Sequence, residues 1–164
     1  GRTWGLARND LAVNRLDAPL LMAAPNNNPQ WVAGSGAAAP IVQVWRSAGN
    51  GFWQLLPGLP SLAPGLAAPT GLAWDGGNRT LYLGVNVGQL YASTNADAAD
   101  IQAVAAAPVA DFGQLGRPVP LAVAAGPTLY VTLWGSYGPR LLRGSWDGQV
   151  WSWLELRLPL VAAG

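Results

Sequence analysis

The sequence predicts an all-β fold of short antiparallel strands, and three observations support that prediction. Short stretches such as Leu81-Tyr82-Leu83-Gly84-Val85 have the period of two that is typical of a strand. The 21 Gly and 14 Pro residues break every longer window in which a helix could form. One strand pattern also recurs three times along the 164 residues, at a spacing of about fifty residues.

Each repeat is expected to contain four strands. An apolar strand is followed by one with an aromatic residue, then by one that ends in a small polar residue, and a fourth follows a Gly or Asp turn. The first repeat contains PLLMAAPNNNPQWVAGSG and IVQVWRS, the second PTGLAWDGGNRTLYLGVN and GQLYAST, and the third PLAVAAGPTLYVTLWG and RLLRGSWDGQVWSWLEL. The fourth strand of the second repeat is expected within NADAADIQAV, residues 95–104.

Large apolar residues, here called anchors, are expected at matching positions of the repeats. A four-stranded sheet of this size cannot bury both faces alone, so it must stack on a neighbour, and aromatic rings supply the apolar area. The second-strand anchors are Trp31, Tyr82 and Tyr130; the third-strand anchors are Trp45, Tyr91 and Leu142; the fourth-strand anchors are Trp4, Trp53 and Trp151, with Asp100 in the second repeat.

Four short strands in a repeat of this length indicate the blade of a β-propeller. We therefore predict a single all-β region, a β-propeller of four-stranded antiparallel blades. Three whole blades are expected at about 18–61, 62–112 and 118–157, and the edges of neighbouring blades at 1–17 and 158–164. Three blades do not close a ring, because propellers usually have at least about four. The remaining blades would come from more of the polypeptide or from another copy; otherwise the fold is not a closed propeller.

The turns between the third and fourth strands share a sequence motif. Ser145-Trp146-Asp147-Gly148-Gln149-Val150-Trp151 contains Ser, Asp, Gly and Trp in order, and Ser47-Ala48-Gly49-Asn50-Gly51-Phe52-Trp53 keeps Ser, Gly and Trp. Ser93-Thr94-Asn95 keeps Ser, with Asn in the place of Asp, and Gly1-Arg2-Thr3-Trp4 keeps the end of the motif. These turns resemble the Asp-box, Ser-x-Asp-x-Gly-x-Thr-Trp, of the sialidase-like BNR-repeat β-propellers.

The resemblance implies a structural role for the polar residues of these turns. In that family the Asp-box lies at the outer edge of the blade, where its side chains bond the backbone of the turn itself. The residues to which this role carries over are Ser47, Asn50, Ser93, Ser145 and Asp147.

The resemblance also implies a possible activity, that of a sialidase-type glycosidase. The active site of such an enzyme would contain an Arg triad for the substrate carboxylate, a Tyr/Glu nucleophile pair and an Asp as the acid. The chain contains one Glu, Glu155, which the repeat alignment places in an outer strand, and no facing pair of acids about 5–10 Å apart is evident. The absence of His and Cys excludes Ser/His and Cys/His nucleophiles and the usual zinc, copper and haem ligand sets. We expect no catalytic residue, metal or cofactor in this chain; a glycosidase whose catalytic residues lie outside it is the alternative.

The composition of the chain limits the classes of partner that we expect it to bind. The net charge is +1, and the nine basic residues are all Arg and spread along the chain, which disfavours nucleic acid. Only 10% of residues are charged, against about 25% in typical domains, which favours surfaces covered by partners.

No apolar run approaches the roughly 18 residues of a membrane span. The Lys-free, Ala- and Arg-rich bias is typical of a GC-rich genome, and we expect a bacterial protein that is extracellular or at the cell surface.

The function that we expect is a non-catalytic binding or scaffolding module, part of a larger protein or assembly, with a protein partner, self-assembly or a glycan as its ligand. Trp134, Tyr137 and Trp146 lie in or beside the expected longer loop of the third repeat and are candidates for sugar stacking or a protein contact. The alternative for Trp134 is a core position at a strand end. Asn78 begins an N-x-Thr glycosylation sequon in an expected turn. We expect Asn26-Asn27-Asn28 and Asp75-Gly76-Gly77-Asn78 to form tight turns between the first and second strands, with a Ca²⁺ site built from their oxygens as the alternative.

Overall fold

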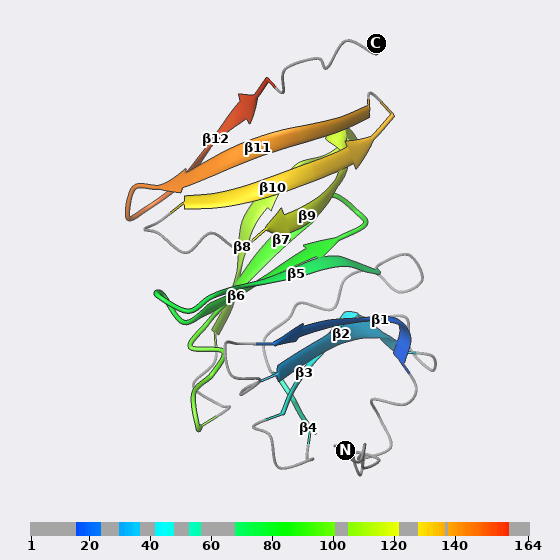
Figure 1. The fold of residues 1–164 in the computed structure, drawn as a ribbon, viewed down its shortest axis with the longest axis vertical. Coiled ribbons are helices and arrows are strands. Elements are labelled where there is room, and N and C mark those ends of the chain that lie inside the picture. Colours follow the sequence, from blue (N-terminus) through cyan, green and yellow to red (C-terminus); the bar gives the residue numbers. More distant parts are fainter. Residues whose placement is uncertain are drawn as a thin grey trace, which may run out of the picture.

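The described residues of the chain form three antiparallel sheets of four strands each (Figure 1). The computed structural model describes residues 16–23, 30–36, 42–47, 53–56, 68–100, 105–121, 128–136 and 138–157. Within these ranges there is no α-helix, and the single helical element is the short 3₁₀ turn η4 (Gly113–Leu115). The predicted all-β class is therefore confirmed.

In each sheet, strands that follow one another in the sequence are neighbours, as expected for short connections. The first sheet contains β1 (Leu16–Ala23), β2 (Gln30–Gly36), β3 (Val42–Ser47) and β4 (Trp53–Leu55). The second contains β5 (Pro69–Asp75), β6 (Thr80–Val85), β7 (Gln89–Thr94) and β8 (Ala105–Asp111). The third contains β9 (Arg117–Leu121), β10 (Thr128–Gly135), β11 (Gly138–Trp146) and β12 (Trp151–Leu156).

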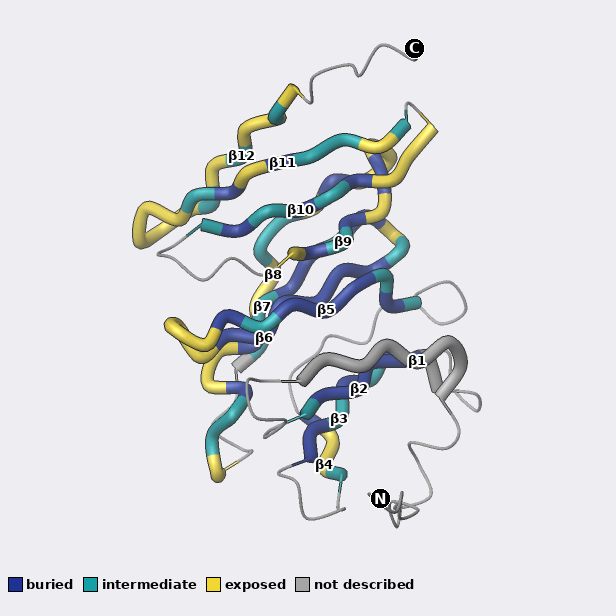
Figure 2. Tube along the Cα trace, viewed as in Figure 1, coloured by how far each residue is buried: buried dark blue, intermediate teal, exposed yellow. Residues whose placement is uncertain are grey.

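The sheets stack face to face, and the first strands β1, β5 and β9 of successive sheets lie against one another (Figure 1). One core lies between the first and second sheets and includes Trp31, Leu83 and Tyr91; the other lies between the second and third sheets and includes Tyr82 and Val131. Strand β6 is buried along its whole length because its alternate side chains enter the two cores. Figure 2 shows this concentration of buried residues in β5 and β6, and exposed residues along β12.

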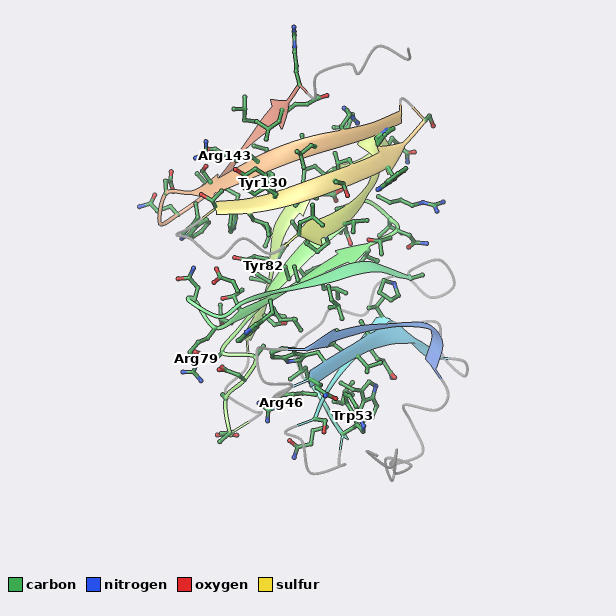
Figure 3. All side chains as sticks on the ribbon, in the orientation of Figure 1. Arg46, Trp53, Arg79, Tyr82, Tyr130 and Arg143 are labelled. Atoms are coloured by element: carbon green, nitrogen blue, oxygen red, sulfur yellow. The ribbon has the colours of Figure 1, made fainter. Side chains whose placement is uncertain are left out.

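Strand register confirms two of the three predicted anchor positions. In every sheet the third-strand anchor pairs with the residue directly after the second-strand anchor. The pairs are Trp45 with Val32, Tyr91 with Leu83, and Leu142 with Val131. The second-strand anchors pair with Arg46, Ala92 and Arg143 in turn, and Figure 3 shows Tyr130 and Arg143 together on the third sheet. Identical register places matching residues on matching faces, because successive strand residues alternate sides.

The fourth-strand prediction was wrong in two repeats. Trp53 pairs with Ser47, and the matching pair of the third sheet is Gly144 with Trp153, so Trp153 rather than Trp151 occupies the place of Trp53. The difference arises because β11 continues past Gly144 to Trp146 before the chain turns.

In the second sheet the fourth strand is β8, residues 105–111, rather than a strand within 95–104. Asn95 has a φ of 53°, and its carbonyl accepts a hydrogen bond from Ala98 N at 2.8 Å, so this segment forms a turn. Asp100 consequently lies in a bend ahead of the strand, and Trp4 lies outside the described residues.

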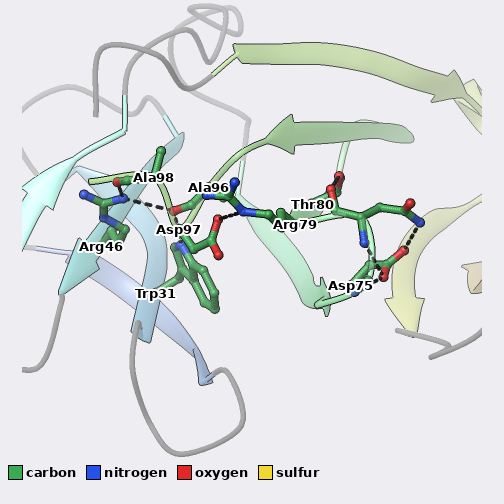
Figure 4. Close-up of polar contacts among 10 residues, drawn as sticks. Trp31, Arg46, Asp75, Arg79, Thr80, Ala96, Asp97 and Ala98 are labelled. Carbon is green, nitrogen blue, oxygen red and sulfur yellow. Dashed lines mark hydrogen bonds and ion pairs between the residues drawn. The ribbon is translucent and has the colours of Figure 1, made fainter. Parts of the chain in front are cut away.

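Side chains of the first sheet reach the backbone of the turn that follows β7 in the second sheet (Figure 4). Trp31 Nε1 donates to the carbonyl of Ala96 at 3.2 Å, and Arg46 Nη1 donates to the carbonyls of Ala96 and Ala98. Burial lowers the pKa of Arg46, and the nearby Asp97 carboxylate opposes that shift. Trp31 and Arg46 are cross-strand partners, so one pair of neighbouring residues in the first sheet makes all these hydrogen bonds to the turn after β7.

The inner strands of the second and third sheets approach so closely that side chains do not fit between them. A Cβ atom at Gly84 would overlap the carbonyl oxygen of Pro118, and one at Gly71 would lie 2.8 Å from Cγ1 of Val119. Thr70 Oγ1 also donates a hydrogen bond to the Pro118 carbonyl. Glycine inside β5 and β6 therefore permits backbone contact between sheets.

Candidate functional site

Trp134 and Trp146, predicted to share one site, lie at opposite ends of the third sheet. Trp134 pairs with Pro139 near the start of β11, whereas Trp146 ends that strand. A strand advances about 3.4 Å per residue, so the nine residues of β11 keep the two rings apart. The predicted longer loop is also wrong, because β10 extends through Gly135 and pairs with Gly138 across Ser136 and Tyr137. Tyr137 lies outside the described residues.

A polar cavity of about 500 Å³, here called the Trp134 hollow, opens where three connections meet. Asn86 contributes from the turn between β6 and β7, Gln114 from η4, and Ser136 from the turn between β10 and β11. Arg117 and Trp134, cross-strand partners in β9 and β10, complete the wall with three glycines. The hollow thus draws residues from two sheets.

Local hydrogen bonds fix the walls of the Trp134 hollow. Asp111 Oδ1 accepts from Gly113 N at 2.8 Å, and Arg140 Nη2 donates to the Leu115 carbonyl at 2.5 Å, so η4 is held at both ends. Gly116 has a φ of 151°, and a Cβ there would lie 3.1 Å from the Trp134 carbonyl oxygen, so a side chain at this position would be strained. Trp134 itself is 57% exposed. The core position that was its alternative role is therefore wrong.

Trp146 lines a second cavity of about 400 Å³ at the other end of the sheets, here called the Trp146 hollow. Trp146 and Trp151 line this hollow, and their ring centroids lie 5.7 Å apart. Trp153 continues the aromatic row beyond the hollow, stacked on Trp151 at 5.7 Å. Tyr82 meets Trp151 edge-on at 6.1 Å. Burial, with a further effect from Asp75, raises the pKa of Tyr82 to about 12.

Glu155, the only Glu of the chain, lies in the outer strand β12 as expected and lines a third cavity of about 490 Å³ together with Asp111 and Arg140. Arg140 Nη1 lies 3.9 Å from Glu155 Oε2. Both carboxylate oxygens of Asp111 accept hydrogen bonds, Oδ1 from Gly113 N and Oδ2 from Gln89 Nε2 at 3.3 Å. Sequence reasoning missed Asp111, since 44 residues separate it from Glu155 and only the stacking of sheets brings them to one cavity.

The acidic turn residues bond their own backbone. Asp147 Oδ1 accepts from Gln149 N at 2.8 Å and Val150 N at 2.9 Å, and these bonds lower the pKa of Asp147. Asp75 binds Gly77 N and Asn78 N in the same way, and Asn78 Nδ2 donates to Asp75 Oδ2 at 2.8 Å. Asn78 is exposed on this turn.

The serines of the repeated turns lie at the ends of their strands. Ser47 and Ser93 are buried there, and Ser145 is half-buried. Asn50 lies outside the described residues. Among the residues that are described, no group of three or more acidic, His or Cys side chains could hold a metal ion.

Comparison with known proteins adds no family. No protein-family model matches the chain, and no curated protein matches it. Among the described residues, no helix is long and apolar enough to span a bilayer. The geometry of the three cavities is therefore the basis for any function.

Proposed function

We propose that this chain forms part of a β-propeller that acts as a non-catalytic binding module at the cell surface or outside the cell. Three four-stranded sheets stacked through adjacent first strands are what consecutive blades would provide. The degenerate Asp-box turns agree with this, since Asp147 closes its turn through two backbone hydrogen bonds. The blade boundaries at 18–61, 62–112 and 118–157 belong to this proposal.

The observation that carries the binding function is the Trp134 hollow. An exposed indole can stack on the apolar face of a sugar ring, while the amides of Asn86 and Gln114 and the guanidinium of Arg117 can bond its hydroxyl groups. A volume of about 500 Å³ lies within the usual range of small-molecule sites. We therefore propose a glycan as the ligand of the Trp134 hollow.

A glycan array followed by titration of tryptophan fluorescence tests this function. Trp134→Ala is expected to weaken binding of the best glycan by at least about tenfold, because the stacking surface is lost. Gln114→Ala, at an exposed position of η4, should weaken it less while leaving the fold intact. Trp146→Ala is the matched control, since this Trp lines the other hollow. Binding that depends on Trp146 and not on Trp134, or the absence of any glycan ligand, would contradict the proposal.

A glycoside hydrolase remains the second candidate, and a specific observation favours it: Asp111, Arg140 and Glu155 line one cavity. Retaining and inverting glycosidases need two carboxyl groups on one site. The bonds that Asp111 makes to Gly113 N and Gln89 support a structural role for it instead. Turnover of a fluorogenic glycoside that is lost in Glu155→Gln would decide for the enzyme.

A further inference from the structure

One face of the third sheet, here called the outward face, points away from the second sheet. Leu129, Val131 and Leu133 enter the core with the second sheet, so their neighbours Tyr130 and Thr132 point to the other side. None of the described strands lies on that side (Figure 1).

Cross-strand pairing defines the rows of the outward face. Tyr130 pairs with Leu121 and Arg143, and Arg143 pairs with Leu154, so these four residues form one row. Leu154 is 60% exposed and Leu121 is 44% exposed. An exposed apolar sheet face of this kind is typical of an interface.

In the first and second sheets, the face that corresponds to the outward face is covered by the next sheet. The side bearing Trp31 is covered by the second sheet, and the side bearing Tyr82 is covered by the third. In both cases the covering surface is the face that carries the third-strand anchor, Tyr91 or Leu142. The same stacking mode therefore occurs twice within the chain.

The first sheet carries the corresponding surface on its other side, which none of the described strands covers (Figure 1). Val32, Trp45 and Leu55 form a cross-strand row on the face opposite to Trp31, and Trp45 is the third-strand anchor. Leu55 is 45% exposed and Trp45 is half-buried, whereas Val32 is already buried, so Trp45 and Leu55 are the residues that this row offers for contact. The described part of the chain thus carries both halves of one further interface of the same type, at its two ends.

The position of Arg143 also indicates that the outward face corresponds to the covered face of the first sheet. It holds the register position of Arg46, because Tyr130 pairs with Arg143 as Trp31 pairs with Arg46. Arg46 crosses the first interface to donate to backbone carbonyls, whereas Arg143 is exposed on the outward face (Figure 3). A sheet placed on the outward face would give Arg143 the role that Arg46 has.

We propose that a second copy of this chain places the Val32–Trp45–Leu55 row of its first sheet on the Tyr130–Arg143–Leu154 row of the third. The two faces differ, so the contact is head-to-tail, and the reciprocal contact closes a dimer. The described residues of two copies form six sheets, within the range of about four to eight blades found in closed propellers. This inference goes beyond ligand binding, since it assigns a partner and two faces.

The proposal can be tested by measuring the oligomeric state of the wild type and of two variants that each introduce a charge. The wild type is expected to form a dimer of twice 17.0 kDa in sedimentation or light scattering. Leu154→Arg and Leu55→Arg should each weaken the dimer by at least about a hundredfold, because each places an unpaired charge in an apolar contact. Val150→Arg is the matched control, since Val150 is 58% exposed in the turn between β11 and β12.

Mixing the two variants identifies the geometry. In an equimolar mixture with one variant isotope-labelled, a single intact contact remains, so native mass spectrometry should detect mixed dimers that neither variant forms alone. A contact of the outward face with itself would instead leave Leu55→Arg dimeric. A monomeric wild type, a dimer that survives Leu55→Arg, or an unlimited polymer would overturn the proposal. Neither Leu55 nor Leu154 lines the Trp134 hollow, so this outcome is separable from glycan binding.

Discussion

The two interfaces between sheets are built from the same repeat, yet their described aromatic residues are packed in different ways. In the first, Trp31 is fully buried, its ring lies 4.5 Å from that of Trp74, and its indole N–H reaches the Ala96 carbonyl. In the second, the row of Trp146, Trp151 and Trp153 borders two cavities of about 400 and 490 Å³.

The difference originates in the outer strand of the second sheet. Strand β8 has the sequence AAAPVAD, and Ala107, Pro108 and Val109 line the Trp146 hollow. These short side chains leave space beside the tryptophans, although the inner strands touch at Gly84 and Pro118. A repeat can therefore keep its inner strands packed while its outer strands open into cavities.

The largest expected effect is the loss of Trp31. Trp31→Ala should destabilise the chain by about 4 kcal/mol, because it removes a fully buried ring and leaves a cavity. Trp153→Ala should cost about 2 kcal/mol, since Trp153 is only half-buried and borders a cavity that already exists. Urea unfolding followed by circular dichroism measures both. Equal losses would mean that the two interfaces are equally filled.

A smaller effect is expected when a side chain is enlarged at each interface. Ala33 is fully buried in the first interface, and added methylene groups strain a closely packed core, so Ala33→Leu should destabilise by about 2 kcal/mol. Ala92 lines the Trp146 hollow, so Ala92→Leu should be neutral or stabilise by up to about 1 kcal/mol. Thermal unfolding of the matched pair measures the difference, and destabilisation by both substitutions would contradict the contrast.

A pH dependence is also expected, and it arises in the second interface. The pKa of Tyr82 is raised from 10.0 to about 12, so between these values the unfolded chain loses a proton that the folded chain keeps. Stability should therefore be complete below about pH 10 and fall as pH rises toward about 12. Urea unfolding across this range should show the decline, reduced in Tyr82→Phe.

Tyr91, whose pKa is also raised by burial, shifts stability in the same direction. Part of the decline is therefore expected to persist in Tyr82→Phe and to disappear when Tyr91 is also replaced by Phe. A decline that is the same in the wild type and in Tyr82→Phe would exclude Tyr82 as its source.

The sequence by itself determined the strands and much of their register. Anchors such as Trp31 with Trp45 and Tyr82 with Tyr91 could be matched because strand pairing is local in the sequence and side chains alternate with a period of two. The fourth strands were harder to predict. Whether β11 turns at Ser145 or continues to Trp146 depends on pairing with β12, and the turn at Asn95 displaced β8 beyond the expected residues.

Only the tertiary structure decided which residues share a site. Trp134 and Trp146 are close in the sequence, but β11 carries them to opposite ends, whereas Asn86 and Ser136 meet because the sheets stack. Stacking brings together residues from different repeats. The sequence pattern within one repeat contains no information about the distance between its residues and those of another repeat. The same stacking buries the face of Tyr82 and leaves that of Tyr130 uncovered by any described strand, although the two residues hold one register position.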